Sequence, residues 1–130
     1  MALVYDAEQA PAPAGWAAAS QEERVLAVEA HHAGLGAGHP PVERPRVHAA
    51  LHVVVEDQVA GNSPTQAAQA LARLVGAGVT RHAALHAIGR IASEALAASL
   101  ASGRFDAHAY ARALEALTPA AVPPPTTHPA

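Results

Sequence analysis

The amino-acid sequence predicts an all-α protein, a small bundle of four to five helices with an extended N-terminal arm. Hydrophobic residues make up 51% of the 130 residues but aromatic residues only 3%, so alanine supplies most of the apolar content. Alanine favours helices and adds little bulk to a sheet. No segment alternates apolar and polar residues as a strand does, whereas residues 85–100 repeat apolar positions at helical spacing.

The two ends of the chain differ in composition from the middle. Residues 1–19 are rich in alanine and proline without a helical period, and we expect Tyr5 and Trp16 to hold this arm against the core. Residues 20–118 carry the helical pattern and form the expected domain. The Pro/Thr-rich residues 119–130 predict a disordered tail.

Capping residues and breakers set the expected helices in order. The capping box from Ser20 to Glu23 begins a helix over 21–33, and the glycines and prolines of 34–46 predict a loop. A second helix follows over 46–60. A second capping box at Ser63, with proline at the next position, begins a third over 64–75. Thr80 caps a fourth helix over 81–101. Asp106 caps a short fifth helix, which ends before Pro119.

Composition excludes several classes of function. The net charge is −3 and the eight basic residues are all arginine, which provides no cationic stripe for nucleic acid. No apolar run approaches the length of a membrane span and no secretory signal is evident, so we expect a cytoplasmic protein without a membrane partner. The absence of cysteine excludes thiolate metal sites and disulfides. Any metal ligand must be histidine, aspartate or glutamate.

The nine histidines are the distinctive feature of the composition. On a helix, His48, His52 and Glu56 lie within about 80° of one another, and His82 and His86 form a similar stripe on the fourth helix. Both stripes lie beside apolar positions and therefore face inward. Buried imidazoles without partners are costly, and an alanine-rich core offers few acceptors. A bound metal ion removes that cost.

The sequence therefore predicts a helical metal-binding domain. Glu29 and His32 add the E-x-x-H spacing of carboxylate-bridged dinuclear sites, with His31 as a competitor for the inward position. His48 is either a ligand or a supporting donor. His39, His108 and His128 are expected to play no part, and Glu94, which lies off the stripe of His82, is expected to be a surface residue or to support a ligand. The expected ligands are Glu29, His32, His48, His52, Glu56, His82 and His86.

Mixed imidazole and carboxylate ligands favour iron, with zinc or manganese as alternatives. Our leading hypothesis is a dinuclear iron site that performs oxidative chemistry on a small molecule of unknown identity. A mononuclear zinc site, hydrolytic or structural, is the second hypothesis. The third is a non-enzymatic interaction module with structural histidines. A peptidase is not expected, because alanine follows the first histidine of both H-x3-H pairs. The small apolar side chains also suggest a homodimer.

The chain resembles an uncharacterised family of small bacterial proteins, a domain of unknown function, over about residues 5–100. That resemblance implies no established activity, but it implies that the N-terminal arm belongs to the domain. The chain departs from the pattern at Asp57, where asparagine is expected, and at Ala83, where an acidic residue is expected. The residues that carry the resemblance are Tyr5, Asp6, Pro11, Pro13, Trp16, Glu23, Arg24 and the ranges 28–32, 48–60, 71–74 and 81–89.

The pairs His52-x3-Glu56 and His82-x3-His86 also resemble ligand pairs of hemerythrin, a four-helix bundle that holds two irons and binds dioxygen. The similarity is one of spacing, and the C-terminal ligands of hemerythrin have no counterpart here. It supports a metal-binding class and not an oxygen carrier.

Overall fold

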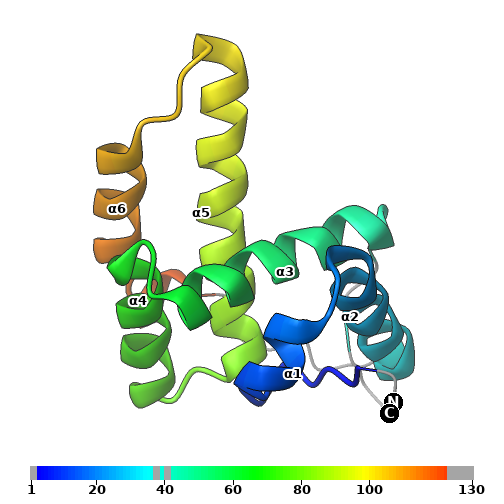
Figure 1. Ribbon diagram of the computed structural model, residues 1–130. Coiled ribbons are helices and arrows are strands. Elements are labelled where there is room, and N and C mark those ends of the chain that lie inside the picture. Colours follow the sequence, from blue (N-terminus) through cyan, green and yellow to red (C-terminus); the bar gives the residue numbers. More distant parts are fainter. Residues whose placement is uncertain (1–2, 37–38, 40–41, 123–130) are drawn as a thin grey trace.

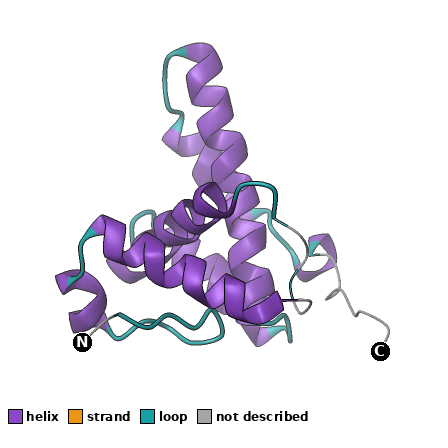
Figure 2. Cartoon of the chain, turned by 90° about the vertical axis from the view of Figure 1, so that its right-hand side faces the viewer, coloured by secondary structure: helices purple, strands orange, loops and turns teal. Residues whose placement is uncertain are grey.

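The computed structural model describes residues 3–36, 39 and 42–122, and all regular structure in these residues is helical (Figure 2). This confirms the all-α prediction. Six α-helices are present in the described residues, and a short 3-10 helix follows them. They are α1 (Pro13–Ala18), α2 (Gln21–Leu35), α3 (Pro45–Gly61), α4 (Thr65–Gly76), α5 (Arg81–Ser102), α6 (Ala107–Glu115) and the 3-10 helix η2 (Pro119–Ala121).

Helix α3 lies at the centre of the packing. It contacts α2 on one side and both α4 and α5 on the other, and α4 and α6 also pack against α5. Figure 1 shows α5 extending past its crossing with α3, so that its C-terminal half lies beside α6. The core contains one or two aliphatic side chains from each of these helices, including Val28, Val53, Leu74, Leu85, Ile88 and Leu114.

Most predicted helix starts are confirmed by their caps. Ser20 and Glu23 form the reciprocal capping box of α2, and the side chains of Thr80 and Asp106 accept backbone N–H bonds at the starts of α5 and α6. The capping box predicted at Ser63 is wrong. The Ser63 N–H donates instead to the Gln58 carbonyl, so Ser63 completes the C-terminus of α3, and α4 begins without a side-chain cap.

The N-terminal arm is partly helical, which the sequence did not predict. Pro13 stands at the start of α1, where its fixed φ suits a helix. The helix has only six residues and buries only Trp16, too little to produce a visible period. Both Tyr5 and Trp16 are buried, as expected of an arm held against the core. Within the expected tail, Pro119–Ala121 form η2, and residues 123–130 lie outside the described chain.

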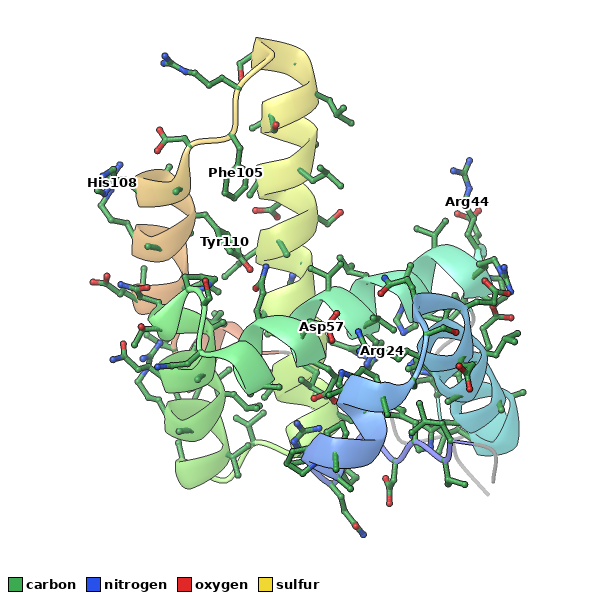
Figure 3. The ribbon with its side chains drawn as sticks, viewed as in Figure 1. Arg24, Arg44, Asp57, Phe105, His108 and Tyr110 are labelled. Carbon is green, nitrogen blue, oxygen red and sulfur yellow. The ribbon has the colours of Figure 1, made fainter. Side chains whose placement is uncertain are left out.

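A polar cluster attaches α1 to α2 and α3. The Trp16 indole donates to Asp57 at 2.7 Å, and Arg24 forms an ion pair with the same carboxylate at 3.4 Å. Figure 3 shows Arg24 and Asp57 side by side between these helices. Arg24 also donates to the Trp16 carbonyl and lies over the indole ring.

No helix of the described chain is long and apolar enough to cross a membrane.

Candidate metal centre

Histidine side chains from α2, α3, α5 and the loop before α3 come together where these three helices meet. Five of them each offer a ring nitrogen within 4.8 Å of all the others. Helix α2 provides one, the loop before α3 provides another, α3 provides one and α5 provides two. The five are His32, His39, His48, His82 and His86, and we call them the histidine cluster.

Four of these rings form a square. The ring centroids of His32 and His48 are 4.7 Å apart, those of His48 and His86 4.8 Å, those of His86 and His82 4.3 Å, and those of His82 and His32 5.0 Å. The diagonal from His32 to His86 is longer, at 6.2 Å. The corners of the square therefore follow the order 32, 48, 86, 82.

Two further rings contact all four corners. The His39 ring lies 4.7–5.2 Å from each of them, and the His52 ring lies 4.6–5.1 Å from each. Two rings on the same side of the square could not both be this close to every corner without overlapping. His39 and His52 therefore lie on opposite faces, and the six rings have the arrangement of an octahedron.

The cluster nitrogens approach one another as ligands of one ion do. The Nε2 atoms of His32 and His82 are 3.1 Å apart, those of His32 and His48 3.2 Å, those of His48 and His86 3.1 Å, and those of His39 and His86 3.3 Å. Nitrogens about 2.1 Å from a common ion lie about 3.0 Å apart at adjacent octahedral corners and about 3.4 Å apart in a tetrahedron. The spacing of these nitrogens therefore fits a metal centre.

Hydrogen bonds fix the free nitrogen of two rings. The Nδ1 atom of His32 lies 2.8 Å from the Val28 carbonyl, to which it can only donate, so its Nε2 carries the lone pair. The Tyr5 hydroxyl donates to Glu56 at 2.5 Å, which leaves its oxygen to accept from Nδ1 of His52 at 3.4 Å. Among the buried side-chain nitrogen and oxygen atoms of the described residues, Nε2 of His52 is the one that has no hydrogen-bond partner. A cation would satisfy this lone pair.

The two expected carboxylate ligands, Glu29 and Glu56, do not lie in the histidine cluster. Glu56 is 1% exposed, and both of its oxygens accept from Arg81, at 2.7 and 2.8 Å. Among the described contacts, the Tyr5 hydroxyl links Glu56 to His52. Glu29 forms an ion pair with Arg46 at 3.0 Å. A guanidinium presents two parallel donors that match a carboxylate, and helical periodicity did not show that Arg81 would reach Glu56.

Four histidines lie outside the expected ligand set. His39, expected to play no part, joins the cluster. Its loop has no period that could reveal the direction of its side chain. Of the adjacent pair on α2, His32 faces the centre, whereas His31 accepts the backbone N–H of Ala7 at 3.3 Å and faces the N-terminal segment. His108 lies on α6, far from the cluster (Figure 3). His128 lies outside the described residues, and Glu94 is exposed.

Burial lowers the pKa of most imidazoles at this centre and so favours their neutral form. Desolvation, reinforced by the neighbouring histidines, lowers the pKa of His48 to about 4, that of His86 to about 3 and that of His82 to about 2. The pKa values of His32 and His52 are also lowered, chiefly by burial. Burial and the charge of Glu56 raise the Tyr5 pKa, so its hydroxyl keeps its proton. Neutral imidazole is the form that binds a metal.

Comparisons with known protein families, curated proteins and solved structures were made for the whole chain. None of them gives a match. The resemblance to an uncharacterised bacterial family therefore stays a prediction, and the comparisons lend hemerythrin no support. The functional argument rests on the cluster itself.

Proposed function

We propose that this protein binds a single divalent transition-metal ion through six imidazoles. The observation that carries the proposal is the square of four histidine rings with one further ring against each face. The unpartnered Nε2 of His52 supports it independently, because a buried polar atom normally has a partner. The proposed ligands are the five histidines of the cluster, whose ring nitrogens lie within 4.8 Å of one another, and His52, which is outside that group and whose Nε2 would complete the shell.

The donor set favours iron(II) or nickel(II). Imidazole suits iron, nickel, copper and zinc. Zinc sites are almost always four-coordinate, and copper(II) prefers a tetragonal arrangement, whereas six imidazoles around one point suit an octahedral ion. Manganese favours oxygen ligands. Iron, the metal favoured by the sequence, thus stays a candidate, now with nitrogen ligands alone.

A shell filled by six protein ligands favours metal binding, storage or transfer over catalysis, since no position is left for a substrate. The dinuclear iron site and oxidative chemistry expected from the sequence would need bridging carboxylates. Glu56 and Glu29 are both engaged with arginines. We therefore propose one ion per chain.

Metal content of the full chain, purified without a histidine tag, tests this function. After reconstitution with iron(II) under anaerobic conditions, or with nickel(II), we expect one ion per chain. X-ray absorption should show six nitrogen neighbours. Two irons per chain with a visible charge-transfer band would overturn the proposal in favour of the dinuclear site. One zinc with four nitrogens would favour the zinc site, and no metal would leave the histidines a structural role.

Replacing Tyr5 with phenylalanine should weaken metal binding about 10- to 100-fold, the usual effect of removing a group that orients a metal ligand. The change removes the acceptor for Nδ1 of His52 and leaves the ring in place. Competition with a chelator measures the affinity. Tyr110→Phe is the matched control, because it removes a hydroxyl bonded to Gln58 on another part of α3. Equal metal affinities in the two variants would contradict the role of Tyr5.

A further inference from the structure

In the described residues no carboxylate belongs to the proposed ligand set of this centre, although Glu8 accepts the backbone N–H of His82 at 3.3 Å. This inference rests on the function proposed above. All six proposed ligands are neutral imidazoles. Of the nearby carboxylates, Glu56 is paired with Arg81 and Glu29 with Arg46. The centre would therefore keep its full double positive charge in a partly buried place. Such a charge favours an anion close by.

A cavity adjoins the centre on the side where α3 meets α5. Its volume is about 270 Å³, and the rings of His48, His52 and His86 form part of its wall. Leu51 and Leu85 supply apolar walls. Arg90 and Glu94 both stand at the exposed rim. Because the two rim charges oppose each other, attraction for an anion comes mainly from the metal centre.

The His48 and His86 rings line this cavity, and each has a second ring nitrogen besides the Nε2 that faces the centre. A histidine that binds metal through Nε2 carries a proton on Nδ1, which it usually donates to a carboxylate, a carbonyl or water. His32 has the Val28 carbonyl for this bond, and His52 has Tyr5. His48 and His86 approach the centre through Nε2, and their Nδ1 atoms have no acceptor in the described chain. An anion in the cavity would supply one.

Gly89 gives the cavity part of its space. A Cβ atom added at Gly89 would lie 3.5 Å from the Leu51 side chain, an ordinary van der Waals contact. The crossing of α3 and α5 therefore does not require glycine here. The missing side chain leaves room beside the apolar walls instead, enough for a small molecule with a short aliphatic part.

We propose that this cavity binds a small aliphatic carboxylate. Its oxygens accept from Nδ1 of His48 and His86, and its hydrocarbon part lies against Leu51, Leu85 and Gly89. The carboxylate balances the charge of the metal centre without replacing a ligand. Binding of the anion and of the metal should consequently depend on each other.

Calorimetric titration of the nickel-loaded full chain with acetate, propionate and butyrate tests the site. We expect one carboxylate per chain, with an affinity that rises about three- to fourfold for each added methylene group. The metal-free chain should bind none of the three. Equal affinities for the three acids, or equal binding with and without nickel, would overturn the proposal.

The Gly89→Ala variant locates the site, because its methyl group occupies space beside Leu51. It should keep one nickel per chain but lose most of the preference for butyrate over acetate. Gly76→Ala is the matched control, since a Cβ there meets nothing within 4 Å, and it should behave as the original chain. A retained butyrate preference in Gly89→Ala contradicts the proposed site.

Nickel content, measured first in each sample, separates the two proposals. A chain that binds nickel but no carboxylate disproves the carboxylate site alone. A chain that binds neither nickel(II) nor iron(II) disproves both.

Discussion

Replacing His82 and His86 together with alanine is expected to abolish stoichiometric metal binding and leave the chain helical. The two rings occupy neighbouring corners of the histidine square, with centroids 4.3 Å apart. Loss of a group that only orients a ligand costs about 10- to 100-fold in metal affinity, so loss of two ligands should cost more than about 100-fold. Metal content after dialysis and chelator competition measure the loss, and circular dichroism checks the fold.

The same measurement on His31→Ala and His108→Ala provides the controls. His31 is next to a proposed ligand but bonds to the backbone of Ala7, and His108 lies on α6 away from the cluster. Both variants should bind one ion with nearly unchanged affinity. Unchanged metal content in the His82/His86 variant would show that the cluster is not the binding site.

The fold class followed from local signals that do not depend on tertiary structure. Capping side chains at Ser20, Thr80 and Asp106 act within one turn of their own helix, and the structure contains all three caps. Helix α1 was missed because six residues with one buried side chain leave no period to detect. The predicted box at Ser63 failed because the preceding helix uses the backbone of that residue.

The site was predictable only where a helix fixes the direction of the side chain. Spacing by four placed His48, His52, His82 and His86 on inward faces, and the structure brings their rings together. Periodicity gives the face on which Glu56 lies but not its partner on another helix. His39 comes from a loop, where sequence spacing carries no directional information. Its role depends on contacts between α2, α3 and α5.

Replacing Arg81 with methionine is expected to lower the free energy of unfolding of the metal-free chain by about 3–5 kcal/mol. Both oxygens of Glu56 accept from Arg81, and Glu56 is 1% exposed. Without Arg81 its charge would be buried with only the Tyr5 hydroxyl as donor. Urea unfolding measures the effect. Arg46→Met, which removes solvent-screened ion pairs with Glu22 and Glu29, should lower the free energy of unfolding much less.

The double variant Arg81→Met/Glu56→Met separates stability from metal binding. It removes both charges of the buried pair, so it should recover most of the lost stability. Metal affinity should stay about 10- to 100-fold below that of the original chain, because Tyr5 loses the acceptor that orients its hydroxyl toward His52. If the double variant recovered both the free energy of unfolding and the metal affinity, Glu56 would contribute to folding stability and not to metal binding. Recovery of stability without affinity would show that the buried ion pair holds Tyr5, and through it His52, in position for the metal.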